Sequence, residues 1–176
     1  MRVLVLGGIR SGKSNWAETA IAASAAGAPV RYLATGPLAD DDASWAQRVS
    51  VHRARRPDSW STVETSDVAT QLRSCNDKPT LVDDIGGWLT TAMDRAGAWD
   101  GGSVGADIDD LVDAVAGFAA DLVLVSPEVG LTVIPETAAG RRFADALGTL
   151  NQRLAATCDR VVLVVAGQPV TVKEPS

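Results

Sequence analysis

Gly7-Gly8-Ile9-Arg10-Ser11-Gly12-Lys13-Ser14 reads as a complete phosphate-binding loop, with the pattern G-x-x-x-x-G-K-[ST]. Its glycines let the backbone curl so that N–H groups point at phosphate oxygens, and a following helix adds its positive end. In this pattern Lys13 reaches the β- and γ-phosphates, and the Ser14 hydroxyl binds Mg²⁺. A Gly-rich turn that binds nothing is the alternative. It is disfavoured because an apolar run, Val3–Leu6, precedes the loop and a helical pattern follows it.

Strand-like and helix-like segments alternate along the whole chain. Short apolar runs predict strands at Val3–Leu6, Val30–Ala34, Trp60–Val63, Thr80–Val82, Leu122–Ser126, Val161–Val165 and Val170–Val172. Helical spacing predicts helices at Lys13–Ala26, Asp40–Arg56, Asp67–Arg73, Gly87–Arg95, Asp107–Ala119 and Thr137–Cys158, with a surface loop at Gly97–Gly105. Together with the phosphate loop, this alternation predicts one α/β domain over residues 1–176. We expect a P-loop NTPase (RecA-like) three-layer fold with a mostly parallel central sheet.

Composition narrows the class of protein. The chain has 176 residues, of which 46% are hydrophobic, enough to fill one core. A net charge of -6 argues against broad, charge-driven nucleic-acid binding. Cys75 and Cys158 form no C-x-x-C pair, so we expect no disulfide framework and no zinc site. No apolar run has the length of a membrane span or of a signal peptide, so the expected location is the cytoplasm.

Acidic residues at strand ends are candidate ligands for Mg²⁺ and nucleotide. Asp83 follows the Thr80–Val82 strand, at the edge of the sheet where open α/β sheets bind ligands. Asp84 could hold the metal instead, or cap the next helix. Glu64 follows another predicted strand and could accept hydrogen bonds from a base or ribose, or be a solvated acid. Glu128 ends the Leu122–Ser126 strand at the same edge.

His52 is the only histidine in the chain, and three arginines surround it: Arg53, Arg55 and Arg56. A neutral imidazole is a nucleophile that can form covalent intermediates. The arginines could hold a polyphosphate beside it. From composition alone, a surface histidine on a basic helix remains the simpler interpretation.

The motifs together resemble the bifunctional adenosylcobinamide kinase/adenosylcobinamide-phosphate guanylyltransferase family. The resemblance covers nearly the whole chain. It is carried by the G-G-x-R-S-G-K-S loop at Gly7–Ser14, Tyr32–Thr35, the R-V-S-V-H-R-A-R-R-P segment at Arg48–Pro57 with Trp60, and Leu81–Ile85. The C-terminal half adds Glu128–Gly130, Ile134–Glu136, Arg142-Phe143, Gly148, Asn151-Gln152 and Ala166-Gly167. The phosphate loop is generic, whereas the histidine segment and the C-terminal motifs are specific in combination.

This resemblance implies that His52 attacks the α-phosphate of GTP and carries GMP covalently. It implies catalysis by His52 and Lys13, with Mg²⁺ on Ser14 and Asp83. Nucleotide contacts are implied at Gly7, Gly8, Ile9, Arg10, Ser11, Gly12, Lys13, Ser14, Thr35, Gly36, Pro37, Arg53, Ala54, Arg55, Arg56, Glu64 and Asp83. The implied substrates are ATP, GTP and a corrinoid, the implied assembly is a homotrimer, and no nucleic-acid partner is expected.

Three positions depart from the family pattern. Pro127 stands where asparagine is frequent, Thr132 where glycine is common, and Gly86-Gly87 where polar or branched residues are usual. We expect these departures to affect corrinoid preference or the balance of the two activities, and to leave the phosphate loop and His52 unchanged.

Two other functions fit parts of the pattern. A small-molecule P-loop kinase needs the phosphate loop but no covalent histidine. A GTP-binding regulatory switch needs no small acceptor, but the chain has no guanine-reading N-K-x-D motif, which weakens this alternative.

Overall fold

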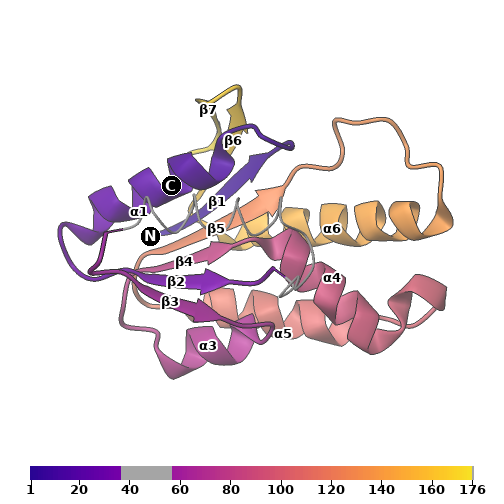
Figure 1. Ribbon diagram of the computed structural model, residues 1–176, viewed down its shortest axis with the longest axis horizontal. Coiled ribbons are helices and arrows are strands. Elements are labelled where there is room, and N and C mark those ends of the chain that lie inside the picture. The colour runs from indigo at the N-terminus through magenta and orange to yellow at the C-terminus, as the bar shows by residue number, and fades with distance from the viewer. Residues whose placement is uncertain (37–56, 176) are drawn as a thin grey trace.

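A computed structural model describes residues 1–36 and 57–175 and shows a seven-stranded sheet with the order β3-β2-β4-β5-β1-β6-β7 (Figure 1). Every strand pairing is parallel except that of β6 with β7. The strands are β1 (Arg2–Gly7), β2 (Arg31–Ala34), β3 (Ser61–Glu64), β4 (Thr80–Asp83), β5 (Leu122–Pro127), β6 (Arg160–Val165) and β7 (Gln168–Lys173). All seven predicted strands are therefore confirmed, with ends shifted by one or two residues, and so is the mostly parallel sheet.

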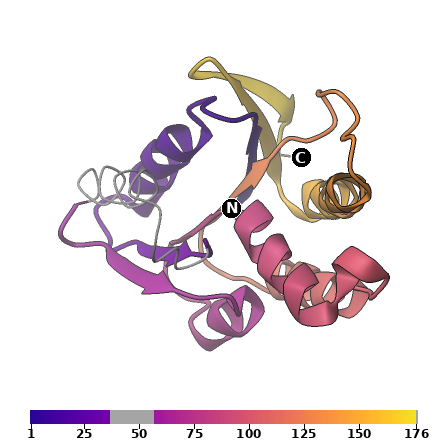
Figure 2. The ribbon, with the colours of Figure 1, turned by 45° about the vertical axis from the view of Figure 1, so that its right-hand side comes forward.

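Helices cover both faces of the sheet, which gives the predicted three layers. One face carries α1 (Lys13–Ala25). The other carries α3 (Val68–Ser74), α4 (Ile85–Ala96), α5 (Gly105–Ala116) and α6 (Ala138–Thr157) (Figures 1 and 2). Neighbouring side chains of a strand point to opposite faces, and both faces are covered by helices. The central strands therefore bury most of their residues, which explains their unbroken apolar runs.

The core is accordingly divided into two clusters by the sheet. Val5, Leu81 and Val125 pack with Ile21 of α1. Leu4, Val82 and Leu124 pack on the opposite face with side chains of α3 to α6. Each fully buried leucine or valine contributes roughly 1.5–3 kcal/mol relative to exposure. Cys158 belongs to the second cluster, and burial raises the pKa of its thiol to about 12.

Side-chain caps decide where three helices begin. The Asp67 carboxylate accepts a hydrogen bond from the Thr70 N–H at 3.1 Å, and the Thr137 hydroxyl accepts one from Gly140 N–H at 3.0 Å. Asp84 accepts one from Gly87 N–H at 2.7 Å, so α4 begins at Ile85, two residues before the predicted start. The alternative interpretation of Asp84 as a helix cap is confirmed.

Two further segments differ in detail from the prediction. The helix predicted at Asp107–Ala119 runs from Gly105 to Ala116, and the chain beyond it buries Phe118 in the core. The predicted loop Gly97–Gly105 contains a 3₁₀ turn, η1 (Ala98–Asp100). The helix predicted at Asp40–Arg56 lies outside the described residues.

Candidate active site

The phosphate loop joins the end of β1 to the start of α1 and needs its glycines for space and for backbone conformation. Gly12 has a φ of 93°, and a Cβ there would lie 3.1 Å from the Gly167 Cα. A Cβ on Gly7 would lie 2.9 Å from the Val164 carbonyl oxygen. The Gly167 N–H donates to the Ser11 carbonyl at 2.7 Å and ties the loop to the β6–β7 turn. The loop is therefore held in shape by its neighbours, with Arg10 in a left-handed conformation at its exposed tip.

The loop places cationic and polar groups at the amino end of α1. Lys13 and Ser14 are the first residues of this helix, where free N–H groups and the helix dipole favour an anion. The Lys13 ammonium donates to the Gly8 carbonyl at 3.4 Å and so lies over the loop. The Ser11 hydroxyl is buried and has no hydrogen-bond partner within the described part of the chain. This arrangement suits the phosphates of a nucleotide.

Asp83 lies on the α1 face of the sheet, at the end of β4, and β5 lies between β4 and β1. It pairs in register with Val125 of β5, which pairs with Val5 of β1. The Tyr32 hydroxyl donates to the Asp83 Oδ2 at 2.8 Å and orients the carboxylate. This partner was missed from sequence, because only the alignment of β2 beside β4 brings Tyr32 and Asp83 together.

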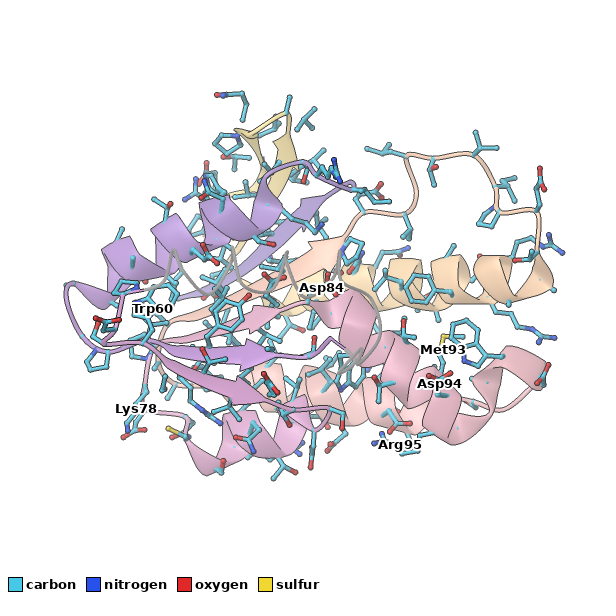
Figure 3. All side chains as sticks on the ribbon, viewed as in Figure 1. Trp60, Lys78, Asp84, Met93, Asp94 and Arg95 are labelled. Carbon is cyan, nitrogen blue, oxygen red and sulfur yellow. The ribbon has the colours of Figure 1, made fainter. Side chains whose placement is uncertain are left out.

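Asp84 lies between the end of β4 and the start of α4, as Figure 3 shows. Burial raises the pKa of its carboxyl above the ordinary value, and the charge of Asp83 raises it further, while Lys13 acts in the opposite direction. The two carboxylates and Lys13 therefore share one electrostatic environment at the carboxyl edge of the sheet.

The available donors suit Mg²⁺. A serine hydroxyl and carboxylates are hard oxygen ligands, and Mg²⁺ is usually held by one or two carboxylates together with substrate phosphates. Within residues 1–36 and 57–175, no three His, Cys, Asp or Glu side chains gather into a closed metal cage. Ser14 and Asp83 would thus share the ion with nucleotide oxygens and water.

The other predicted nucleotide contacts fall at the same edge or outside the described residues. Thr35 is buried, and its hydroxyl donates to the Asp84 carbonyl, so it supports the β4–α4 turn. Gly36 is exposed beside it, and Glu64 is exposed at the end of β3, level with Ala34. Six predicted site residues lie outside the described residues: Pro37, His52, Arg53, Ala54, Arg55 and Arg56.

Sequence reasoning gave no role to a cavity of about 590 Å³ on the α6 face of the sheet. The Glu128 N–H donates to the Gly7 carbonyl at 3.1 Å, so this cavity adjoins the phosphate loop. The available signals were the motifs at Glu128–Gly130, Gly148 and Asn151-Gln152, whose residues line the cavity together.

Comparison with known protein families decides the class of enzyme. Residues 3–172 match the family described as "Cobinamide kinase / cobinamide phosphate guanyltransferase". This chain belongs to that family. The predicted family is therefore confirmed, and with it the function as a cobinamide kinase and cobinamide-phosphate guanylyltransferase of adenosylcobalamin biosynthesis.

Curated relatives match this chain over nearly their whole length. The bifunctional adenosylcobalamin biosynthesis protein CobP of Pseudomonas aeruginosa is 38% identical over 98% of this chain and 98% of its own. The protein CobU of Escherichia coli K12 is 36% identical and that of Salmonella typhimurium 37%, each over 98% of this chain and 100% of its own.

Solved structures support the fold alone. A type III secretion ATPase has a TM-score of 0.60 at 12% identity, covering 97% of this chain and 56% of its own. The flagellar accessory protein FlaH of Methanocaldococcus jannaschii has a TM-score of 0.51 at 10% identity, covering 99% of this chain and 78% of its own. The chain thus spans about half of the secretion ATPase. The predicted P-loop, RecA-like fold class is confirmed.

None of the described helices is both long and apolar enough to cross a membrane.

Proposed function

We propose that this chain performs both family reactions at one nucleotide site. ATP or GTP first phosphorylates the hydroxyl of the aminopropanol arm of adenosylcobinamide. GMP is then transferred from GTP to the new phosphate, which gives adenosylcobinamide-GDP. The observation that carries this proposal is the complete phosphate loop, Gly7–Ser14, in a chain that matches the family over residues 3–172.

The first reaction needs mainly positioning and charge neutralisation. The loop N–H groups and the start of α1 hold the β- and γ-phosphates, and Lys13 neutralises the charge that develops between them. Ser14 and Asp83 would hold Mg²⁺, which when bound polarises the transferring phosphoryl group. Tyr32, 2.8 Å from the Asp83 Oδ2, keeps that carboxylate oriented.

The second reaction passes through His52. An imidazole nitrogen attacks the α-phosphorus of GTP, forming a P–N bond and breaking the P–O bond to the β-phosphate, so that pyrophosphate leaves. A phosphate oxygen of the cobinamide phosphate then attacks the same phosphorus, and the P–N bond breaks. Arg53, Arg55 and Arg56 offset charge on the departing pyrophosphate.

The remaining contacts hold the nucleotide. Glu64 accepts hydrogen bonds from the base or ribose. The nucleotide is also contacted by Thr35, Gly36 and Pro37 and by Arg53, Ala54, Arg55 and Arg56. Their support is the resemblance and, for Thr35, Gly36 and Glu64, a position at the carboxyl edge of the sheet.

The covalent step is tested with GTP labelled at the α-phosphate. The protein is incubated with Mg²⁺ and labelled GTP, denatured, and examined for label on the chain. We expect label that is stable to alkali, labile to acid and absent from His52→Ala. Kinase activity on cobinamide should persist in that variant. Absence of label, with GTP binding and kinase activity intact, would leave a simple kinase as the function.

We further propose a single-domain homotrimer located in the cytoplasm, on the strength of the resemblance. Sedimentation velocity of the purified protein tests the assembly, and a monomer at micromolar concentration would contradict it. Fractionation of the producing cells tests the location. Limited proteolysis tests the single domain, because two domains would give two stable fragments.

A further inference from the structure

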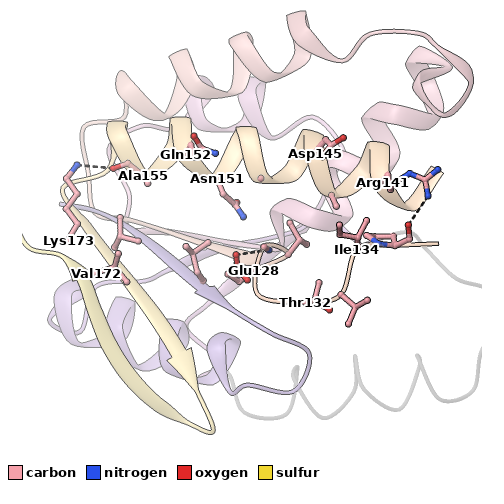
Figure 4. A pocket seen from close by; sticks show the side chains of 18 residues that line it. Glu128, Thr132, Ile134, Arg141, Asp145, Asn151, Gln152, Ala155, Val172 and Lys173 are labelled. Atoms are coloured by element: carbon pink, nitrogen blue, oxygen red, sulfur yellow. Dashed lines mark hydrogen bonds between the residues drawn. The ribbon is translucent and has the colours of Figure 1, made fainter. Parts of the chain in front are cut away.

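The cavity on the α6 face has the dimensions of a small-molecule site. Its volume of about 590 Å³ lies within the range of roughly 300–1,000 Å³ that is usual for ligand pockets. Its walls are the segment 128–135 after β5, one face of α6, and the end of β7 (Figure 4). Leu6 and Val161 line the cavity, and both pack in the core cluster on the α6 face of the sheet. The sheet therefore lies between the cavity and α1.

Internal hydrogen bonds keep the walls of this cavity in place. The Glu128 carboxylate accepts from the N–H groups of Gly130 and Leu131, both at 2.8 Å. Arg141 of α6 donates to the carbonyls of residues 135 and 136, and Lys173 of β7 donates to carbonyls at the end of α6. These bonds tie all three walls together, so the cavity is preformed.

Gly148 leaves the centre of the α6 wall open. It lies on one helix face with Ala144, Asn151 and Ala155, all of which line the cavity. A Cβ on Gly148 would meet no atom of the described residues within 4 Å, so there is open space directly above this position. Glycine inside a helix costs about 0.5–1 kcal/mol relative to alanine. The open wall is thus maintained at a cost to stability.

The lining suits a nearly neutral ligand with apolar edges and polar groups. Its charged members are two acids, Glu128 and Asp145, and two bases, Arg141 and Lys173, all but Asp145 held in the internal bonds described above. Asp145 and Gln152 are exposed at the rim and, among the residues that the structure describes, have no hydrogen-bond partner. A polyphosphate would need an excess of positive charge, which this lining does not have.

We propose that this cavity binds the corrinoid acceptor, with an edge of the macrocycle between α6 and the segment 128–135. Hydrocarbon edges of the corrin would contact apolar lining such as Val133 and Ile134, and its peripheral amides would reach Asp145 and Gln152. The Glu128–Gly7 hydrogen bond of 3.1 Å joins this wall to the phosphate loop, which allows the aminopropanol arm to approach a bound nucleotide. The inference rests on the proposed function, because it takes cobinamide as the acceptor.

Gly148→Leu tests this proposal, because a Cβ at this position meets none of the described atoms within 4 Å and a longer side chain would extend toward the cavity that Gly148 lines. The matched control is Thr149→Leu, on the neighbouring exposed position of α6 that does not line the cavity. Binding of dicyanocobinamide and of GTP is measured by equilibrium dialysis, together with the thermal unfolding midpoint and the sedimentation coefficient. We expect Gly148→Leu to weaken cobinamide binding at least about tenfold, equivalent to about 1.4 kcal/mol. GTP binding and assembly should stay as in the wild type, and the unfolding midpoint of Gly148→Leu should not fall below that of the wild type, because glycine is a poor helix former. Thr149→Leu should leave both binding affinities unchanged.

Other outcomes would overturn the assignment. Unchanged cobinamide binding in Gly148→Leu would place the acceptor elsewhere. A change in sedimentation coefficient would identify the cavity as a contact between copies of the chain, and equal losses of GTP and cobinamide binding would indicate a general structural effect. Kinase assays of the wild type separate these results from failure of the proposed function. If the wild type does not phosphorylate cobinamide, the function is wrong. If it does and Gly148→Leu keeps the wild-type KM for cobinamide, only the cavity assignment is wrong.

Discussion

The phosphate loop and the α6 cavity lie on opposite faces of one sheet and are built in different ways. The loop is a continuous segment, Gly7–Ser14, and in loops of this pattern the main-chain N–H groups contact the phosphates. The cavity is made of side chains from segments as distant as Leu6 and Lys173. A binding loop made of main-chain groups depends on the backbone conformation of one short segment, which few sequences can adopt. The shape and chemistry of a cavity lined by side chains can be altered by a single substitution. We therefore expect nucleotide binding to be insensitive to changes around the cavity, and acceptor binding to depend on them.

Loss of the loop lysine should have the largest effect. Lys13→Met is expected to lower kcat/KM for both reactions at least about 100-fold, because a cation at the developing phosphate charge is lost. Stability should stay near that of the wild type, because the only side-chain hydrogen bond that Lys13 makes to the described residues is the 3.4 Å contact to the Gly8 carbonyl. Steady-state kinetics and thermal unfolding measure the two effects, with the exposed Lys78→Met as control. Wild-type kinetics in Lys13→Met would mean that the loop does not bind the reacting phosphates.

Asp83→Asn should raise the Mg²⁺ concentration needed for half-maximal kinase activity by roughly 10–100-fold, as loss of a metal-supporting group usually does. The amide can still accept the hydrogen bond from Tyr32, so the fold is retained. The measurement is a Mg²⁺ titration of the kinase rate. Tyr32→Phe, which removes only the orienting hydroxyl, should show a smaller shift in the same direction. An unchanged titration in Asp83→Asn would exclude this carboxylate as a ligand.

Asn151→Ala should destabilise the cavity side of the sheet by about 2–3 kcal/mol. Asn151 accepts from the buried Ser126 hydroxyl at 2.6 Å and donates to the Pro127 carbonyl at 3.0 Å, and both groups would lose their partner. Denaturant unfolding gives the free energy. Gln152→Ala, next to it at an exposed position, should change the stability by less than about 0.5 kcal/mol. Equal changes in the free energy of unfolding in the two variants would mean that the buried Ser126–Asn151 hydrogen bond does not contribute to stability.

Substitution by alanine should change the stability of the protein in opposite directions at two helix glycines, Gly148 and Gly86. Gly148→Ala adds a methyl group to open space and should stabilise by about 0.5–1 kcal/mol. A Cβ on Gly86 would lie 2.8 Å from the Pro127 Cγ, so Gly86→Ala should destabilise by about 1–3 kcal/mol through overpacking. Pro127→Ala should relieve that cost. Thermal unfolding of the three variants and of the Gly86/Pro127 double variant tests this, and additive effects in the double variant would mean that the two residues do not interact.

The smallest expected effect concerns Asp84 and pH. Because burial raises the folded-state pKa of its carboxyl, Asp84 contributes most to stability below its ordinary pKa of about 3.9, and the contribution falls as pH rises through the raised value. Asn caps a helix as well as Asp. Asp84→Asn should thus be slightly more stable than the wild type at neutral pH and equal to it in acid. Unfolding midpoints between about pH 3 and pH 8 measure the difference, and a variant less stable than the wild type at neutral pH would contradict the sign.

The departures from the family pattern show why contacts could not be predicted. Gly86 and Pro127 are 41 positions apart in the chain, yet a Cβ on one would touch the ring of the other. Each was recognisable as unusual, but only the packing of α4 beside β5 shows that they form one contact. Tyr32 and Asp83 are similar, because their hydrogen bond depends on the pairing of β2 with β4.

The sequence by itself determined the features that depend on local periodicity and on a continuous segment. These are the phosphate loop, the alternation of strands and helices, the parallel sheet and, through the motifs, the family. Local backbone preferences and burial patterns act over a few residues, so they can be read along the chain. The tertiary structure alone decided the strand order, the partners of Asp83 and Asp84, and the cavity around Gly148. These depend on long-range packing, which brings distant residues together only when the sheet forms and its two faces are covered.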